Sequence, residues 1–333
     1  MTERPRILVT NWAYPETLQA LAAAGTVDAN PDRTVWPREE IVRRAAGADA
    51  IMAFMPDCID AAFLKHCGRL RVVACALKGF DNFDVVSCTA AGVWLAIVPD
   101  LLTEPTAELG VGLAIGLGRM IRDGDAIVRS GKFDGWRPVL YGAGLNGSTV
   151  KIVGMGQVGR AIAQRLSGFG CHLLGVDPGA DMPPGIAGRD LGSALAESDY
   201  VMLAAPLSPA THHLIDAGAL AAMRPGALLI NVGRGSVVDE NAVADALERG
   251  TLGGYAADVF EMEDWALSER PLTIALRLRT HPRTLFTPHL GSAVAQVRRA
   301  LEMRAADNII DVLAGQRPRD AINEPMLVAE KAG

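Results

Sequence analysis

The stretch that decides the fold is residues 149–177, TVKIVGMGQVGRAIAQRLSGFGCHLLGVD. It opens with a short apolar run at 150–153, which has the length and β-branching of a buried parallel strand. A glycine-rich turn at 154–159 follows, then a helical pattern and a second apolar run at 173–176. Asp177 closes the stretch, about twenty residues beyond the glycines, where a dinucleotide site carries its acid. This order of strand, glycine turn, helix, strand and acid predicts dinucleotide binding.

The glycines of the turn have separate roles in such a site. Gly154 permits the tight turn, Gly156 lets the backbone approach a pyrophosphate, and Gly159 lets the helix pack close to the strand. The helix N-terminus offers unpaired N–H groups and a partial positive charge to the phosphates. Asp177 is expected to accept hydrogen bonds from the adenosine ribose and to repel a 2′-phosphate, and the next residues supply no arginine. NAD is therefore the expected cofactor, in preference to NADP.

Length and composition narrow the class of protein further. The chain has 333 residues, of which 50% are hydrophobic, enough for two domains. A net charge of −6 without a long basic block argues against nucleic acid as the main partner. The five cysteines lack C-x-x-C spacing and are typical of reduced thiols in the cytoplasm. No signal peptide is expected, because the N-terminus MTERPRILVT has no apolar run. No membrane span is expected, because the most apolar segment, 109–117, is too short to cross a bilayer. No metal site is expected either.

Strand-like and helical patterns alternate along most of the chain, which predicts α/β domains with parallel, doubly wound sheets. In the first hundred residues the strand-like runs are 6–10, 50–54, 71–76 and 94–98, and the helical ones are 16–24, 38–46, 60–67 and 84–91. The later strand-like runs are 150–153, 173–176, 200–204, 227–231, 254–258 and 284–287. We expect one domain at 101–292, which binds the dinucleotide, and a second, discontinuous one at 1–100 plus 293–333.

Four further segments connect or close these domains. One long helix is expected over 105–129, with Thr103 as its N-cap, and an irregular arm over 132–142. The last helix, 293–313, has apolar residues at five positions four apart and is expected to pack on the N-terminal domain. Residues 319–333 carry no clear pattern and are expected to form a surface tail.

Ionisable residues follow four of the predicted strands, at the sheet edge where α/β proteins bind ligands. They are Lys78, Arg234, Glu263 and His289. Of the six histidines, only His289 lies in a T-P-H-L-G-S setting. Lys78 lies between an apolar strand and a glycine turn, where a desolvated ammonium is costly without an anion. Two plainer readings stay open, a surface ion pair for Arg234 and a solvated acidic face for the run around Glu263.

These motifs resemble the D-isomer-specific 2-hydroxyacid dehydrogenase family over nearly the whole chain. The matching stretches are 154–159, 231–240 (NVGRGSVVDE), 257–263 (ADVFEME) and 287–289 (TPH). The resemblance implies a Rossmann NAD domain, a smaller flavodoxin-like substrate domain and a homodimer built through an arm at 119–147. It also implies that Arg234 clamps an anionic substrate, that Glu263 hydrogen-bonds His289, the acid/base, and that Asp258 neighbours the nicotinamide.

The chain departs from the usual family pattern at one turn. Ordinary members have G-x-G-x-D-N where this chain has LKGFDN at 77–82, and Asp264 stands where the family often has proline. Similar features, with MAFMPD at 52–57 and GWRP at 135–138, mark the phosphite-oxidising branch of the family. Lys78 and Arg234 together would suit a small tetrahedral dianion. We therefore expect NAD-dependent oxidation of phosphite to phosphate, with hydride transfer to NAD and His289 as base on the attacking water.

The same resemblance implies the remaining site residues. The expected substrate pocket contains Met55, Leu77, Gly79, Trp136, Tyr141, Ser292 and Arg298. The expected cofactor site contains Thr106, Gly154, Met155, Gly156, Gln157, Val158, Gly159, Asp177, Ala205, Pro206, Val232, Gly233, Arg234, Asp258, His289 and Gly291. Two alternatives stay open. An ordinary D-2-hydroxyacid dehydrogenase would reduce glyoxylate or hydroxypyruvate, and Lys78 counts against it. An NAD-sensing binding protein would need no Arg–Glu–His set.

Overall fold

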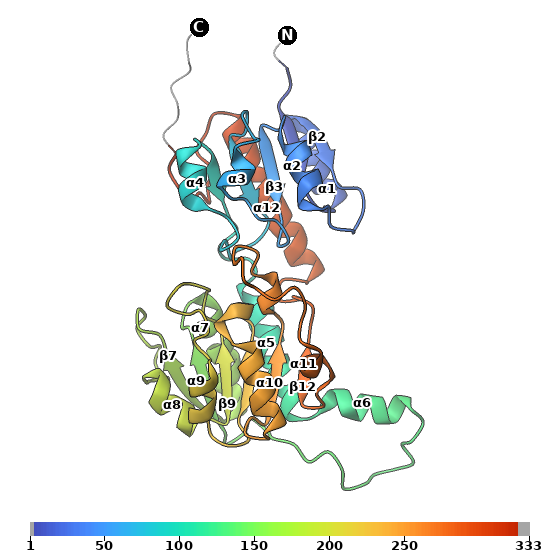
Figure 1. Cartoon of the computed structure of the whole chain (residues 1–333), viewed down its shortest axis with the longest axis vertical. Coiled ribbons are helices and arrows are strands. Elements are labelled where there is room, and N and C mark those ends of the chain that lie inside the picture. The colour runs from blue at the N-terminus through green and yellow to red at the C-terminus, as the bar shows by residue number, and fades with distance from the viewer. Residues whose placement is uncertain (1–2, 326–333) are drawn as a thin grey trace. The chain divides into compact units, whose positions relative to one another are not determined.

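The computed structural model describes residues 3–325, which form two compact α/β units (Figure 1). Unit 1 consists of Met1–Leu102, Trp265–Ser268 and Val294–Gly333, and unit 2 of Thr103–Asp264 and Glu269–Ala293. The predicted division left out the short segment Trp265–Ser268, which clusters with unit 1 although it lies far along the chain. Within it, the Ala266 N–H donates to the Asn82 side-chain oxygen at 3.1 Å.

Unit 1 is built on a five-stranded parallel sheet with the order β2-β1-β3-β4-β5. Its strands are β1 (Arg6–Val9), β2 (Thr26–Ala29), β3 (Ala50–Ala53), β4 (Val72–Cys75) and β5 (Trp94–Ala96). Its helices are α1 (Pro15–Ala24), α2 (Arg38–Ala45), α3 (Ala61–Leu64), α4 (Val85–Ala90) and α12 (Ala295–Leu313). This strand order is the flavodoxin-like one. The sequence reading missed β2, an edge strand that is only partly buried and therefore lacks a continuous apolar run.

The last helix, α12, packs on the unit 1 sheet as expected. Its Ala305, Ala306 and Ile309 are fully buried in one cluster with Ile7 of β1 and Met52 of β3. The segment after it was expected to be a surface tail, and for its first part this is wrong. The Ile322 N–H donates to the Leu95 carbonyl at 2.9 Å, and the Leu95 N–H donates to the Asn323 side chain at 2.8 Å. These bonds cap the edge strand β5, whereas residues 326–333 lie outside the described part of the chain.

Unit 2 is built on a seven-stranded parallel sheet with the order β12-β11-β10-β9-β6-β7-β8. Its strands are β6 (Thr149–Val153), β7 (His172–Val176), β8 (Ala187–Gly188), β9 (Tyr200–Leu203), β10 (Leu228–Asn231), β11 (Gly254–Ala257) and β12 (Thr284–Phe286). Its helices are α5 (Thr103–Gly118), α6 (Ile121–Arg129), α7 (Gln157–Leu166), α8 (Leu191–Glu197), α9 (Ala217–Ala222), α10 (Glu240–Glu248) and α11 (Leu276–Thr280), with short 3₁₀ turns η1 (Ser167–Phe169), η2 (Gly235–Val237) and η3 (Glu261–Glu263). This is the Rossmann order with one added strand, and the two-residue β8 was too short to predict.

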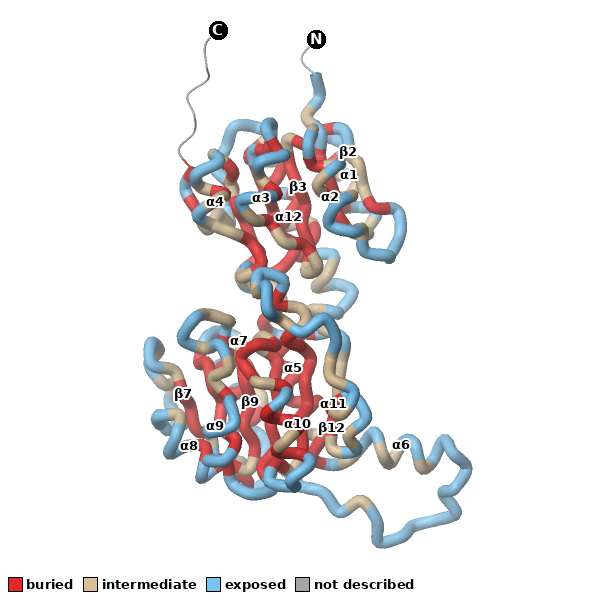
Figure 2. The backbone as a smooth tube through the Cα atoms, in the orientation of Figure 1, coloured by how far each residue is buried: buried red, intermediate tan, exposed pale blue. Residues whose placement is uncertain are grey.

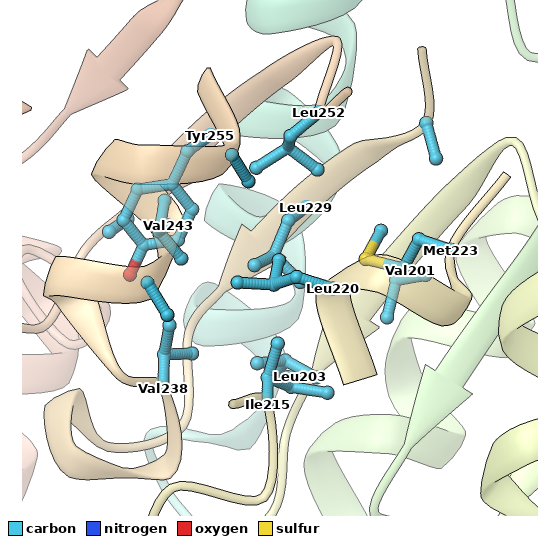
Figure 3. Close-up of a cluster of buried hydrophobic side chains, with 14 of the residues drawn as sticks. Val201, Leu203, Ile215, Leu220, Met223, Leu229, Val238, Val243, Leu252 and Tyr255 are labelled. Atoms are coloured by element: carbon cyan, nitrogen blue, oxygen red, sulfur yellow. The ribbon is translucent and has the colours of Figure 1, made fainter. Parts of the chain in front are cut away.

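Aliphatic side chains fill the space between the unit 2 sheet and its helices. Val201 and Leu203 of β9 and Leu229 of β10 meet Leu220 of α9 and Val243 of α10 (Figure 3). Each of these five side chains is at most 4% exposed. Burying a side chain of this size stabilises the fold by about 1.5–3 kcal/mol. The central strands of both units appear as buried segments in Figure 2, whereas the edge strands β2 and β8 are partly or fully exposed.

The long helix expected over 105–129 is broken in the structure. It divides into α5 and α6 at Met120, whose backbone has a positive φ of 52°. The Gly118 carbonyl accepts the Ala143 N–H at 2.8 Å, and a Cβ on Gly118 would lie 2.5 Å from the Tyr200 hydroxyl. The Gly118 carbonyl thus bonds to the segment at Ala143, which returns from the arm, and not to a further turn of helix α5. Beyond it, α6 and the irregular segment 130–142 form an arm that leaves the unit 2 sheet (Figure 1).

Two further properties concern only the part of the chain that the structure describes. No helix there is long and apolar enough to cross a membrane. Among the same residues, no group of three or more His, Cys, Asp or Glu side chains is arranged to hold a metal ion.

Candidate active site

Three predicted catalytic residues follow three neighbouring strands of unit 2. Arg234 follows β10, Glu263 ends η3 after β11, and His289 follows β12. Strands β10, β11 and β12 are parallel neighbours, so their carboxyl ends meet at one edge of the sheet. The structure thus places these three residues at the carboxyl edge of a single sheet.

Glu263 and His289 form a hydrogen-bonded dyad. The His289 Nδ1 lies 2.6 Å from Glu263 Oε2, and both side chains are mostly buried. The other carboxylate oxygen of Glu263 accepts the Phe260 N–H at 2.9 Å, so the backbone fixes the carboxylate. A carboxylate at Nδ1 keeps a proton there, stabilises the imidazolium and leaves Nε2 to exchange a proton. The dyad therefore has the geometry of a general acid/base.

Asp258 holds the turn that carries His289. Its carboxylate accepts the Thr287 hydroxyl at 2.6 Å and the N–H groups of Leu290 at 2.6 Å and Gly291 at 2.8 Å. Its side chain is almost fully buried; burial raises its pKa, and these hydrogen bonds and the His289 charge oppose the shift. His289 itself has a positive φ of 57°, a strained conformation that the surrounding bonds must maintain. Sequence reasoning assigned Asp258 only to the cofactor and missed this role, although its place one strand away from T-P-H was a signal.

The loop that carries Arg234 is pinned by Asn231. The buried Asn231 side chain donates to the Arg234 carbonyl at 2.8 Å and accepts the Gly233 N–H at 3.0 Å. Arg234 is partly exposed, which leaves its guanidinium, a fork suited to two oxygens, at the sheet edge. A Cβ on Gly235 would lie 1.9 Å from the Phe260 carbonyl carbon. The Arg234 loop and the Glu263 loop therefore touch backbone to backbone.

The glycine turn after β6 fits a dinucleotide. Gly154 has a φ of +90°, and a Cβ there would lie 2.7 Å from the Ala205 nitrogen. A Cβ on Gly159 would lie 1.9 Å from the Gly154 oxygen, whereas nothing lies within 4 Å of one on Gly156. Gly156 is exposed and directly precedes α7, so a diphosphate can approach the helix N-terminus at that point. Gln157 and Val158 lie in the first turn of α7, and Met155, two residues before the helix, is fully buried.

Asp177 lies at the end of β7, next to this turn. Its carboxylate accepts the Met155 N–H at 2.8 Å and the Gly179 N–H at 2.9 Å. These bonds hold the acid beside the glycine turn, where the ribose of a dinucleotide lies in this fold.

Other predicted cofactor residues lie along the same edge. A Cβ on Gly233 would lie 2.5 Å from the Ala205 oxygen, and one on Gly291 would lie 3.1 Å from the Thr106 hydroxyl. The first contact brings the loop after β10 against the loop after β9, and the second brings the loop after β12 against α5. The neighbouring predicted residues Pro206, Val232 and Ser292 lie in the same loops.

Unit 1 carries two of the cations predicted for the substrate site, Lys78 and Arg298. Lys78 follows β4 and is half-buried; burial lowers its pKa, and the nearby Asp100 opposes the shift. Arg298 of α12 donates to the Ala76 carbonyl at 3.3 Å, and its guanidinium lies 5.9 Å from the Phe54 ring centre. Both cations thus lie at the carboxyl ends of the central unit 1 strands. Met55 and Leu77 pack in one cluster there, with Gly79 in the turn that follows.

Trp136 and Tyr141 lie on the arm of unit 2. Their side chains are 82% and 78% exposed. Within this chain the structure therefore does not bring them into contact with the dyad at the carboxyl edge of unit 2. Their assignment to the substrate pocket stays a prediction.

The acidic run after β11 is not a solvated face. Glu261 and Asp264 are 8% and 2% exposed; Glu261 accepts the N–H of Glu240, the first residue of α10, and Asp264 accepts the N–H of Ser236 in η2. Sequence reasoning missed them because their partners lie more than twenty residues away. The charged D-E pair at 239–240, which precedes a helix, was the available signal.

Together these features are those of a dinucleotide-dependent oxidoreductase that carries a hydrogen-bonded His–Glu pair at the carboxyl edge of its sheet. Residues 111–291 match the model of the D-isomer specific 2-hydroxyacid dehydrogenase NAD binding domain. The chain belongs to the D-isomer specific 2-hydroxyacid dehydrogenase family, whose cofactor domain binds NAD.

Similar proteins span the whole chain. A glyoxylate reductase of Pyrococcus furiosus is 33% identical over 99% of this chain and 98% of its own. A Thermus thermophilus protein of solved structure is 33% identical, with a TM-score of 0.87 over 95% of this chain and 99% of that one. A glyoxylate/hydroxypyruvate reductase of Sinorhizobium meliloti, solved with NADP and malonate, is 27% identical, with a TM-score of 0.83 over 96% and 97%.

The expectation that this chain oxidises phosphite is contradicted by these relatives. They include a glyoxylate reductase and a glyoxylate/hydroxypyruvate reductase, which favours the alternative of an ordinary D-2-hydroxyacid dehydrogenase. The two-cation reasoning fails because it does not discriminate between anions. An Arg fork and an ammonium bind a carboxylate with the same contacts that they would offer a phosphite.

Proposed function

We propose that this chain reduces a small 2-oxo acid of the glyoxylate or hydroxypyruvate type to a D-2-hydroxy acid. The observation that carries the proposal is the 2.6 Å bond between Glu263 and His289 at the same sheet edge as Arg234. Reduction of a 2-oxo acid requires both the His–Glu pair and the Arg234 cation. Its carboxylate needs a cation, and its carbonyl oxygen needs a proton as the carbonyl carbon is reduced.

The residues divide the work between them. Arg234 binds the substrate carboxylate, and Lys78 contributes a second positive charge to the same anion. His289, protonated and held by Glu263, donates its Nε2 proton to the carbonyl oxygen. NADH, when bound, supplies the hydride. The dyad then regains a proton from solvent, for which its partial exposure suffices.

The cofactor is held by the glycine turn and by Asp177. Gly154 permits the tight turn, Gly159 lets α7 pack close to that turn, and Gly156 leaves the space through which a diphosphate would approach the α7 N-terminus. The negative charge of Asp177 disfavours a 2′-phosphate. We therefore propose a preference for NADH over NADPH.

The arm supports the further proposal of a homodimer. No residue of α6 is buried, and the apolar side chains Val128, Phe133, Trp136 and Tyr141 are each at least 57% exposed. Figure 2 shows this arm as an almost continuously exposed segment. A run of exposed apolar side chains is typical of an interaction surface. Light scattering should give twice the chain mass, and the Phe133→Ser/Trp136→Ser double variant should shift towards the monomer.

The function is tested by mixing the purified protein with NADH and either glyoxylate or hydroxypyruvate and following NADH absorbance. Loss of absorbance that depends on the 2-oxo acid is the expected result. A parallel arm offers NAD and phosphite. NADH formation in that arm, without turnover of any 2-oxo acid, would contradict the proposal, and binding of NADH without turnover of either substrate would indicate a sensor.

A further inference from the structure

Two buried glutamates bind each other's backbone at the carboxyl edge of unit 2. The Glu240 N–H donates to Glu261 Oε1 at 2.7 Å, and the Glu261 N–H donates to Glu240 Oε1 at 2.9 Å. Glu240 begins α10 and Glu261 begins η3. Each carboxylate therefore satisfies an N–H that has no partner within its own helix. This reciprocal link joins the start of α10 to the turn that carries Glu263.

Asp264 makes a second link between the same regions. Its side chain is 2% exposed and accepts the Ser236 N–H at 2.7 Å. Ser236 lies two residues after Arg234, and Asp264 lies one residue after Glu263. The close contact of Gly235 with the Phe260 backbone completes the junction. We name residues 231–238 the Arg234 segment and residues 260–264 the Glu263 segment.

The loop that carries His213 contacts both the Arg234 segment and the Glu263 segment. The His213 N–H donates to the Ser236 carbonyl at 2.7 Å, and its Nε2 lies 3.5 Å from Glu261 Oε2. Its backbone has a positive φ of 48°, and its ring stacks on His212 at 4.1 Å. A non-glycine residue in this conformation is strained, so the contacts to Ser236 and Glu261 are what hold it.

Stability alone is a poor explanation for this cluster. Burial raises the pKa of Glu240 to about 7, and the charges of Glu261, Asp264 and Glu263 add to the shift. The buried Tyr255 of β11 faces the same carboxylate, which raises the pKa of its hydroxyl further. Apolar side chains of similar volume are often at least as stabilising as buried charges. Stability therefore gives no reason for buried carboxylates here, whereas their bonds to backbone N–H groups join two segments of the site.

We propose that Glu240, Glu261 and Asp264 are positioning residues that hold the Arg234 segment and the Glu263 segment at a fixed spacing. The inference rests on the proposed function, in which Arg234 binds the substrate carboxylate while the His289–Glu263 dyad protonates its carbonyl. If the two segments separate, the substrate binds with its carbonyl out of line with His289. The loss then falls on kcat, because a small misplacement slows the chemical step more than binding.

Paired variants separate the hydrogen bond from the charge. Asp264→Ala and Glu240→Ala remove the acceptor, whereas Asp264→Asn and Glu240→Gln keep an oxygen in place. The matched control is Asp199→Ala, because Asp199 accepts the Thr149 N–H at 2.9 Å at the opposite edge of the same sheet. For each variant we would measure kcat and KM with the 2-oxo acid, NADH affinity, and amide hydrogen exchange of the two segments.

The alanine variants should lose about 10–100-fold in kcat, as is typical when a supporting residue of a site is removed. Their NADH affinity should stay within about 2-fold, and exchange should accelerate in both segments. The amide variants should recover kcat to within a few-fold of the parent. Asp199→Ala should lower the melting temperature and leave kcat unchanged.

Three results would overturn the inference. One is unchanged kcat in both alanine variants. Another is a kcat loss in Asp199→Ala as large as theirs, which would show a general effect of destabilisation. The last is unchanged exchange in the two segments of the alanine variants. This readout needs no substrate, so it tests the positioning role even if the parent protein turns over no 2-oxo acid, a result that would instead refute the proposed function.

Discussion

The two units have parallel sheets of related design and carry opposite chemistry at their carboxyl edges. Unit 2 gathers carboxylates and histidine there, with Asp258, Glu261 and Asp264 all at most 8% exposed and committed to backbone N–H groups. Unit 1 gathers the cations Lys78 and Arg298, and burial lowers the pKa of both. The difference supports the proposed division of roles, in which the unit 2 edge would hold the cofactor and move a proton, and Lys78 of unit 1 would join Arg234 of unit 2 in attracting the anion.

The largest expected effect tests whether His289, at the unit 2 edge, donates the proton to the substrate carbonyl. His289→Ala should lower kcat with a 2-oxo acid by roughly 10²–10⁴-fold, because it removes the proposed proton donor to the carbonyl oxygen. Steady-state kinetics at saturating NADH measures the loss. His281→Ala is the control, since His281 lies at the other end of β12 and accepts the Arg283 N–H. Near-normal turnover of His289→Ala would remove it from the chemistry.

The anion-binding role of unit 1 is tested at Lys78. Lys78→Ala should raise the KM of the 2-oxo acid by about 10–100-fold, which corresponds to one hydrogen bond to a charged group. The kcat should change little, because the contact is equally present before and during reduction. The exposed Lys65 of unit 1 provides the control substitution. An unchanged KM in Lys78→Ala would leave Arg234 as the only cation on the substrate.

A third prediction tests whether Asp177, at the unit 2 edge, sets the preference for NADH over NADPH. Asp177→Ala should raise the ratio of kcat/KM for NADPH to that for NADH by roughly 10-fold, because a negative charge near the 2′-phosphate is removed. The ratio is the correct readout, since loss of the bond to the Met155 N–H will weaken both cofactors. Asp181→Ala, at an exposed residue nearby, should leave the ratio unchanged. A constant ratio in Asp177→Ala would mean that another residue sets the preference.

The smallest effect concerns the buried carboxylates of unit 2. Glu240 has a pKa of about 7 in the folded protein and an ordinary value of 4.5. The folded protein therefore holds this proton more tightly, and stability falls as pH rises through that window. Glu240→Gln removes the titration, so its melting temperature should fall less than that of the parent between about pH 5 and about pH 8. Parallel pH curves for the two proteins would show that Glu240 is ionised throughout.

The positions of the main site residues in both units could be predicted from the sequence, because short apolar runs mark the strands and the site residues follow the strand ends. Arg234, His289 and Lys78 each follow such a run directly, and the parallel sheet then brings strand ends together. The break at Met120 could not be predicted, because it depends on the returning chain at Ala143. The burial of Glu261 and Asp264 was hidden for the same reason, since their partners are backbone groups distant in sequence. The substrate was predicted wrongly because charge alone does not distinguish one small anion from another.

The most direct test is the configuration of the product. Hydroxypyruvate should be incubated with the protein and NADH, and the glycerate formed should be resolved by chiral chromatography. We expect a single enantiomer of the D configuration, because in the proposed function Arg234 binds the substrate carboxylate while His289 protonates the carbonyl oxygen, which would leave one face of the carbonyl open to the hydride. The L enantiomer or a racemate would contradict the proposed reaction, as would a lack of turnover with both hydroxypyruvate and glyoxylate.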